Sequence, residues 1–274
     1  MTGAFWLPLA FEGEAHLKFV SVNYEQVEGA VVARVTIDRR HKLNAMNSEM
    51  VTQLIETFDS LNGEPDLRAV VLDAAGEKAW IGGADVREMG AFVSSAAAAA
   101  FIGRLHAAML SVRNLPVPVV AKIDGFCLGG GMELAAACDL RIASTAARFG
   151  MPEVRVGLPS VIEASLLPGL MGRGRAARLI YTGEVIDAAQ AEAWGFVEEV
   201  VSRPDLDTAV ERLIGSICKA GPRAIRAQKK LMRHWETVDP DTAAEDSIEV
   251  FGAAYESDEP AKLLGQVFSG HRED

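Results

Sequence analysis

The sequence predicts an α/β fold in which most strands pair in parallel. Short runs rich in β-branched residues recur along the N-terminal two thirds, and each is followed by a turn and by helical spacing of apolar residues. Strand, turn and helix alternate at intervals of roughly 40 to 50 residues, a pattern typical of parallel sheets. The chain has 274 residues, of which 49% are hydrophobic, so it can form one large domain or one domain with an appendage.

The first predicted unit is a strand over residues 31–37, then a charged loop and a helix. Asn47 is suited to cap the helix, the apolar positions that follow have helical spacing, and Asn62-Gly63 ends it.

The next units repeat this order. Pro118 favours an early or edge position for the strand in which it lies. Further strands are predicted over residues 69–72, 117–123 and 139–143, and helices over residues 94–113 and 132–137.

Strands become scarce after about residue 160. One helix is predicted to end at Gly183, and the sequence Asp187-Ala-Ala-Gln190 predicts a capping box that opens another, closed by Gly195. From Leu206 onward the pattern is helical, with breaks at Gly221-Pro222 and Asp239-Pro240. We therefore expect a core over residues 1–203, with an N-terminal extension over 1–16, and a helical region over 204–274 that packs on this core or on a neighbouring subunit.

Composition excludes several classes of protein. The net charge of −11 makes binding to nucleic acid or to an anionic membrane unexpected, although a local basic patch can still bind a small anion. Three cysteines without CxxC spacing and five scattered histidines predict neither a disulfide framework nor a metal site. Residues 1–14 hold no basic residue, and no segment reaches about 18 apolar residues, so we expect a soluble cytoplasmic protein.

Two glycine clusters suggest a ligand site. They occupy residues 81–85 and 128–133, each after a predicted strand and each followed by an acidic residue. Two backbone N–H groups aimed at one oxygen make an oxyanion hole, whereas the simpler interpretation is a pair of tight turns that let helix and strand pack closely. A phosphate loop is excluded because Met132-Glu133 stand where a lysine is needed, and the match from Gly172 to the dinucleotide fingerprint lacks a preceding strand.

Two glutamates lie near the second cluster. Glu133 is followed by Leu134-Ala-Ala-Ala-Cys138, and such apolar surroundings should raise the pKa of its carboxyl group. Glu153 lies in the rigid apolar turn of residues 149–153. Two carboxyl groups in unequal environments can act as an acid and a base, although a lone glutamate is more often a surface residue or a cap.

Two further acidic residues have simpler interpretations. Asp85 precedes Val86-Arg87-Glu88-Met89, so a position at a helix start is favoured over catalysis. Ser160-Val161-Ile162-Glu163 fits a capping box, which is favoured over a third active-site carboxylate at Glu163.

Together these motifs resemble the enoyl-CoA hydratase/isomerase family, the crotonase superfamily. The resemblance runs from about Val31 to Gly195 and is specific for the superfamily rather than for one reaction. It rests on residues 41–47, 81–89, 123–135, 138–139 and 149–153.

The resemblance implies a spiral of ββα turns followed by helices that form a homotrimer, often doubled to a homohexamer. It implies that the N–H groups of Ala84 and Gly130 hold the thioester oxygen of an acyl-CoA, and that no cofactor is needed beyond the coenzyme A of the substrate. The charged loop that includes Arg40 resembles the region that contacts the CoA phosphates and adenine. The residues implied to contact CoA are Arg39, His41, Lys42, Leu43, Ala45, Gly82, Asp85 and Val86.

Both glutamates of the hydratase members are present, at Glu133 and Glu153. This implies addition of water to a trans-2-enoyl-CoA to give a 3-hydroxyacyl-CoA, with Glu133 activating the water and Glu153 protonating the α-carbon. The alternatives are a double-bond isomerase, another acyl-CoA lyase or hydrolase, and, more remotely, a non-catalytic acyl-CoA-binding protein. The chain departs from hydratases in the loop over residues 157–163, which lacks their extra glycines, and in a C-terminus that lacks their basic tail.

Overall fold

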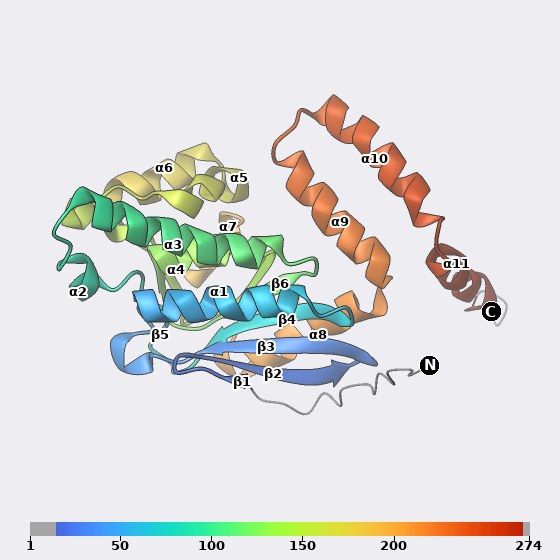
Figure 1. The fold of residues 1–274 in the computed structure, drawn as a ribbon, viewed down its shortest axis with the longest axis horizontal. Coiled ribbons are helices and arrows are strands. Elements are labelled where there is room, and N and C mark those ends of the chain that lie inside the picture. Colours follow the sequence, from blue (N-terminus) through green and yellow to red (C-terminus); the bar gives the residue numbers. More distant parts are fainter. Residues whose placement is uncertain (1–14, 271–274) are drawn as a thin grey trace, which may run out of the picture.

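The computed structural model describes residues 15–270, and its main feature is a seven-stranded sheet (Figure 1). The first three strands pair antiparallel and the others pair in parallel, which confirms the predicted α/β class. The strand order is β1 (Ala15–His16), β2 (Val20–Val27), β3 (Ala30–Ile37), β4 (Leu67–Ala74), β6 (Val119–Ile123), β8 (Leu140–Ser144) and β11 (Glu199–Val201).

A second sheet of four short strands follows the order β10 (Val185–Asp187), β9 (Arg148–Gly150), β7 (Phe126–Leu128) and β5 (Ala79–Ile81). The chain leaves β4, β6 and β8 of the large sheet and enters β5, β7 and β9 of the small one. The β5–β7 and β7–β9 pairs are parallel, so the chain advances as a spiral of two-strand turns with intervening helices. This arrangement is the predicted spiral.

Three helices fill the space beside the sheets. They are α1 (Ser48–Asn62), α3 (Ser95–Asn114) and α4 (Gly130–Ala137), and α3 packs against both of the others. As predicted, Asn47 caps α1, because its side chain accepts a hydrogen bond from the Met50 N–H. The short helix α2 (Val86–Met89) precedes α3.

The opposite face of the large sheet is covered by α8 (Leu206–Lys219). Because side chains alternate along a strand, Val32 points to α8 while Val31 and Ala33 point to the main core. Val210 and Ile214 of α8 complete this second apolar cluster. The first helix of the C-terminal region, α8, is therefore part of the core.

The last three described helices are α9 (Pro222–Trp235), α10 (Pro240–Ala254) and α11 (Glu259–Gly270), and they extend away from the sheets (Figure 1). The breaks before α9 and α10 fall at the predicted Gly-Pro and Asp-Pro pairs. α9 is attached to the core by Lys229, whose Nζ lies 2.7 Å from Asp139 Oδ2 and 2.8 Å from the Val117 carbonyl oxygen.

The remaining helices connect the spiral to α8. Gly183 ends α6 in the left-handed conformation, and the Asp187 side chain caps α7, both as predicted. These elements are α5 (Leu167–Met171), α6 (Arg173–Thr182) and α7 (Ala188–Ala193), with 3-10 turns η1 (Arg40–Lys42), η2 (Pro152–Val156), η3 (Ile162–Leu166) and η4 (Arg203–Asp205).

One helix bears on the expectation that no segment is apolar enough to cross a membrane. By length and composition alone, α3 could cross a membrane, although no such segment was expected. The helix meets this criterion largely because its N-terminal half is rich in alanine, a small apolar residue. In the structure Phe101, Leu105 and Met109 of this helix are buried in the main core. The expected N-terminal extension lies outside the described residues except for β1, and so do residues 271–274 of the C-terminal tail.

Candidate active site

The two glycine clusters meet where β5 and β7 end. A Cβ built on Gly130 would lie 3.6 Å from the Ala84 nitrogen, so the two predicted donors are neighbours. Met46 holds the Ala84 segment in an extended position: its N–H donates to the Gly83 carbonyl at 2.8 Å and its carbonyl accepts from the Asp85 N–H at 2.9 Å. Within residues 15–270, neither the Ala84 nor the Gly130 N–H donates to a backbone carbonyl, so both are available to a ligand oxygen.

Other glycines of the clusters are required by close packing. A Cβ on Gly131 would lie 2.3 Å from the Ile81 carbonyl oxygen, so only glycine lets α4 approach β5. Gly129 has φ +52°, and its Cβ would lie 2.3 Å from Glu153 Oε1. The tight-packing interpretation and the ligand-site interpretation therefore apply to different residues of the same clusters.

Glu133 lies in α4 and is almost fully buried, with 4% of its surface exposed. The Ala164 N–H donates to its Oε1 at 3.3 Å. Burial, and then the negative charges of Glu153 and Glu163, raise the pKa of Glu133 to about 8. The predicted rise in this pKa is confirmed.

Glu153 lies in η2, directly after Pro152, and is half-buried. The Ser160 hydroxyl donates to its Oε2 at 2.9 Å, while Oε1 lies against Gly129 at the start of α4. Glu153 also contributes to the raised pKa of Glu133, which places the two carboxyl groups close enough to interact. The two glutamates therefore have the unequal environments that the sequence predicts.

The predicted capping box over residues 160–163 is wrong. η3 begins after Val161 without a side-chain cap, because the Ser160 hydroxyl bonds to Glu153 and Glu163 bonds to His106. Both partners come from other elements, and tertiary contacts have replaced the local motif. The altered loop thereby contributes directly to the surroundings of both glutamates.

Glu163 was not assigned to the site by the favoured interpretation, yet it lies beside it. It is buried, and its Oε1 lies 2.8 Å from Nδ1 of His106 on α3. Burial raises the pKa of Glu163, and the nearby His106 and Arg113 oppose that rise. The negative charge of Glu163 also acts on Glu133.

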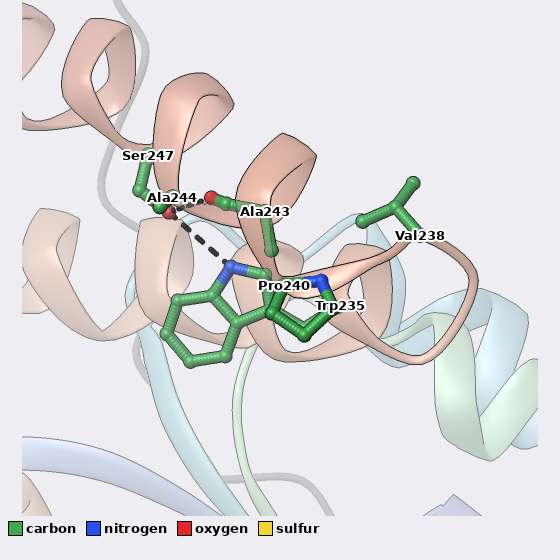
Figure 2. A pocket seen from close by; sticks show the side chains of 6 residues that line it. All are labelled: Trp235, Val238, Pro240, Ala243, Ala244 and Ser247. Atoms are coloured by element: carbon green, nitrogen blue, oxygen red, sulfur yellow. Dashed lines mark hydrogen bonds between the residues drawn. The ribbon is translucent and has the colours of Figure 1, made fainter.

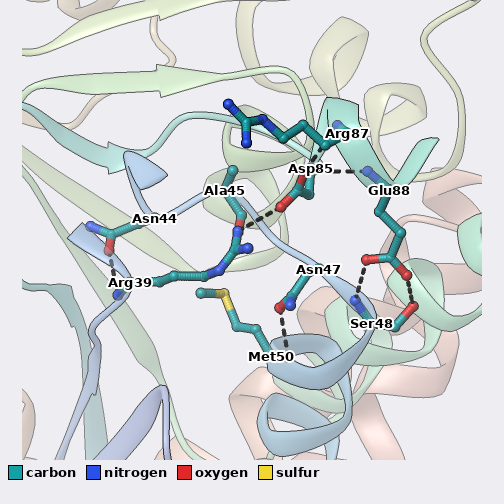
Figure 3. Close-up of polar contacts among 9 residues, drawn as sticks. All are labelled: Arg39, Asn44, Ala45, Asn47, Ser48, Met50, Asp85, Arg87 and Glu88. Atoms are coloured by element: carbon teal, nitrogen blue, oxygen red, sulfur yellow. Dashed lines mark hydrogen bonds and ion pairs between the residues drawn. The ribbon is translucent and has the colours of Figure 1, made fainter. Parts of the chain in front are cut away.

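Arg39, predicted to contact CoA, is turned inward in the structure (Figure 3). Its Nη1 lies 2.8 Å from both the Ala45 carbonyl oxygen and Asp85 Oδ2, and its side chain is only 11% exposed. The Asp85 carboxylate also accepts from the N–H groups of Arg87 and Glu88, which confirms its predicted position at a helix start. Burial raises the pKa of Asp85, but the bonds to Arg39 and to these N–H groups outweigh burial and lower it.

Asn44 organises the charged loop, a role that the sequence did not reveal. Its Oδ1 accepts from the Arg39 N–H at 2.8 Å, and its Nδ2 donates to the carbonyls of Ala75 and Ala79. Leu43 and Asn44 both have positive φ, at 55° and 53°. Because these bonds satisfy the buried amide completely, they hold a strained turn against Gly82, whose N–H donates to the Leu43 carbonyl at 2.9 Å.

The other residues predicted to contact CoA divide by exposure. His41, Lys42, Leu43 and Val86 are exposed, whereas Ala45 is half-buried. Among the described residues, the Lys42 side chain has no ion pair or side-chain hydrogen bond, so its charge is available to an anionic ligand. The loop is also joined to α2 by the Glu88 carboxylate, which bonds to the Ser48 N–H and hydroxyl (Figure 3).

Two hollows open among the C-terminal helices, away from these residues. In the first, Trp235 Nε1 donates to Ser247 Oγ at 3.2 Å across the α9–α10 connection (Figure 2). The second lies among α9, α10 and α11. Neither is lined by Glu133, Glu153 or the glycine clusters, so neither belongs to the predicted reaction centre. Over residues 15–270, no group of three or more His, Cys, Asp or Glu side chains is placed to hold a metal ion.

Two backbone N–H donors beside two carboxyl groups, set in a ββα spiral, define a class of enzyme that polarises a carbonyl oxygen and moves protons next to it. Comparison with known sequences identifies the family within that class. Residues 27–263 match the family described as enoyl-CoA hydratase/isomerase, and the chain belongs to this family.

Individual relatives agree with this assignment. The short-chain-enoyl-CoA hydratase of Clostridium acetobutylicum is 34% identical over 229 residues, which cover 83% of this chain and 87% of the relative. The crotonyl-CoA hydratase of Syntrophomonas wolfei is 33% identical over 226 residues, covering 82% and 86%. The crystal structure of an enoyl-CoA hydratase from Bacillus anthracis superposes with a TM-score of 0.87 at 31% identity, covering 93% of this chain and 97% of that one.

Proposed function

We propose that this protein is an enoyl-CoA hydratase that adds water to a trans-2-enoyl-CoA to give a 3-hydroxyacyl-CoA. The observation that carries the proposal is that Glu153 lies against Gly129 and acts on the charge of Glu133, while the adjacent Gly130 lies close to the Ala84 nitrogen. Two relatives named as hydratases of short-chain enoyl-CoA and crotonyl-CoA support it.

In the proposed reaction the thioester oxygen accepts hydrogen bonds from the Ala84 and Gly130 N–H groups. These donors stabilise the enolate charge that develops as water attacks the β-carbon, and one such donor typically contributes about 3–4 kcal/mol. At neutral pH Glu133 retains its proton, because burial and the negative charge of Glu153 raise its pKa to about 8.

The proton balance assigns the two glutamates complementary roles. Glu133 first passes its own proton to Glu153 and then accepts the proton that the water loses. Glu153 gives the proton that it received to the α-carbon. The pair ends with the single proton with which it began. The raised pKa of Glu133 makes its carboxylate a stronger base than an exposed glutamate.

The reaction is tested by incubating the protein with crotonyl-CoA and following the conjugated enoyl absorbance. Loss of this band with formation of 3-hydroxybutyryl-CoA is the expected result. If the band persists while a 3-enoyl-CoA is converted, the protein is an isomerase instead. Release of free CoA thiol would identify a hydrolase.

Recognition of the CoA moiety is assigned to the exposed side of the charged loop. Lys42 supplies an uncommitted positive charge for a phosphate, while the inward Arg39 holds the loop through Asp85. The anionic substrate is thus met by a local basic group on an acidic protein.

The C-terminal helices are proposed to form a homotrimer or homohexamer. No residue of α10 is buried, and among the described residues of α9 only Lys229 is. The exposed side chains of these helices include Met232, Ile248, Phe251 and Tyr255, an apolar surface that a second copy would cover.

No separate cofactor is proposed, because the N–H donors and the two carboxyl groups account for every proton and charge in the addition. Dialysis of the purified protein against EDTA should therefore leave crotonyl-CoA hydration unchanged. Loss of activity on dialysis and its return on adding a divalent metal would contradict this expectation.

A further inference from the structure

A third carboxyl group, that of Glu163, is buried close enough to Glu133 to act on its charge. It lies in η3, which packs against both α3 and α4. Its Oε1 contacts His106 Nδ1 of α3 at 2.8 Å, whereas its Oε2 is buried without a hydrogen-bond partner among the described residues. A buried carboxylate oxygen without a partner is costly, and such groups are retained where they serve a function.

The position of Glu163 in the chain connects it to Glu133. The residue that follows it, Ala164, supplies the N–H that bonds to Glu133 Oε1. The His106–Glu163 contact therefore fixes the turn from which that N–H is donated. His106 is 48% exposed and Glu163 only 5%, so the pair extends from solvent to the buried carboxyl group.

The charges around Glu163 come from several elements. The negative charges of Glu163 and of Glu153 in η2 both act on Glu133 of α4. His106 and Arg113 of α3 and Arg233 of α9 are the positive groups that act on it. Among the side chains that the structure describes, His106 is the one that hydrogen-bonds to the carboxyl group, so His106 is its local anchor.

We propose that Glu163, anchored by His106, is a positioning residue that acts through Glu133: it holds the Ala164 N–H on the Glu133 carboxyl group and places a negative charge near it. This proposal rests on the proposed hydration reaction, in which Glu133 retains its proton at neutral pH. The charge of Glu163 then helps Glu133 to retain that proton at higher pH.

The kinetic test compares Glu163→Gln with the wild type in pH profiles of kcat/KM for crotonyl-CoA. Glutamine keeps the shape and removes the charge, so the proton of Glu133 is lost more easily. The alkaline limb should move to lower pH by about half a pH unit to one unit, since like charges at this range shift a pKa by that order. Glu199→Gln, which removes an exposed carboxylate paired with Arg212, is the control and should leave the profile in place.

The anchoring role is tested at His106. His106→Leu removes the contact to Glu163 and should lower kcat about tenfold by releasing the Ala164 turn, since small misplacements of catalytic groups have large effects. His106→Asn keeps an N–H donor near the position of Nδ1 and should recover most of that loss. Equal loss in both variants would overturn the anchoring role.

A titration that does not depend on activity separates the inference from the proposed function. In a 13C-carboxyl NMR titration, the Glu133 signal, identified by its absence in Glu133→Gln, should titrate at lower pH in Glu163→Gln than in the wild type. Unchanged titration, or a lower kcat with an unmoved alkaline limb, would overturn the inference. If the Glu133 signal titrates at lower pH in Glu163→Gln, but the wild type does not hydrate crotonyl-CoA, the inference stands and the proposed function is overturned.

Discussion

Glu133 is the residue at which burial and function conflict most directly. Its pKa in the folded protein is about 8, against 4.5 for an ordinary glutamate. Between these two values the folded state binds more protons than the unfolded state, so stability falls as pH rises through this window. The stability associated with this carboxyl group is fully present below about pH 4.5 and is lost by about pH 8.

Glu133→Gln should therefore stabilise the protein while abolishing hydration. The gain in the free energy of unfolding should be about 2–4 kcal/mol near pH 8, where the wild type has to ionise a buried group, and near zero at about pH 4.5. Urea unfolding of the two proteins at both pH values measures it. A difference that does not depend on pH would contradict the raised pKa.

Gly129 offers a second test at the scale of single residues. In Gly129→Ala the new Cβ would meet Glu153 Oε1 at 2.3 Å, and the carboxyl group must move. A displacement of this size should lower kcat about 100-fold. Crotonyl-CoA hydration under saturating substrate measures the effect.

Gly29→Ala is the matched control for this substitution. Gly29 has a similar positive φ, +75° against +52°, but its Cβ would meet nothing within 4 Å. It should cost about 1 kcal/mol of stability from backbone strain and leave kcat unchanged. If both variants lose activity equally, strain rather than contact with Glu153 is the cause.

At the scale of elements, α9 is held to the core by the buried Lys229 and by Arg226, whose Nη2 donates to the Pro65 and Leu67 carbonyls at 2.9 Å. Lys229 is 7% exposed, and burial lowers its pKa although Asp139 opposes this. Lys229→Met leaves Asp139 without its charged partner, although the Val119 N–H still donates to its Oδ2, and should destabilise the protein by about 3 kcal/mol. Thermal unfolding and limited proteolysis between α8 and α9 detect the loss of attachment.

Lys262→Met is the control for this element. Lys262 pairs with Asp258 on the surface of α11, and exposed pairs contribute little. Its effect should stay below about 0.5 kcal/mol. Comparable effects of the two substitutions would show that α9 is held mainly by other contacts.

The element scale also shows what sequence reasoning can reach. The strands beginning at Ala30, Leu67, Val119 and Leu140 were predicted because parallel strands buried on both faces are continuous apolar runs. The strands of the small sheet are three residues long and carry no periodicity, so they were missed. β2 was also missed, because it mixes Val20 and Val22 with polar side chains next to the short edge strand β1.

Some features of the candidate site are likewise visible in the sequence, and others depend on contacts between distant parts of the chain. The two glycine clusters and the neighbouring Glu133 and Glu153 are local motifs that the sequence itself displays, whereas the choice of Ala84 and Gly130 as donors comes from the family resemblance and stays a prediction. The Glu163–His106 contact joins residues far apart in the chain. No local pattern reveals such a contact, and the favoured capping box was wrong for this reason.

At the scale of the whole molecule, the apolar surface of α9–α11 predicts an assembly. Phe251→Glu places a charge on this surface, where burial of an unpaired carboxylate is costly, and should shift the protein toward monomers. Sedimentation velocity measures the change. Leu17→Glu, on the exposed turn between β1 and β2, is the control and should sediment like the wild type. A wild type that is already monomeric would contradict the proposed oligomer.

The two donors beside β5 and β7 are peptide N–H groups, and this has a consequence for how the protein can change over time. A point mutation can replace any side chain, but it cannot delete the N–H of Ala84 or Gly130 unless proline is introduced. Glu133 and Glu153, in contrast, can each be lost in one substitution. The proposed stabilisation of an enolate is therefore robust to substitution, while the proposed reaction that uses it can be replaced within the same scaffold.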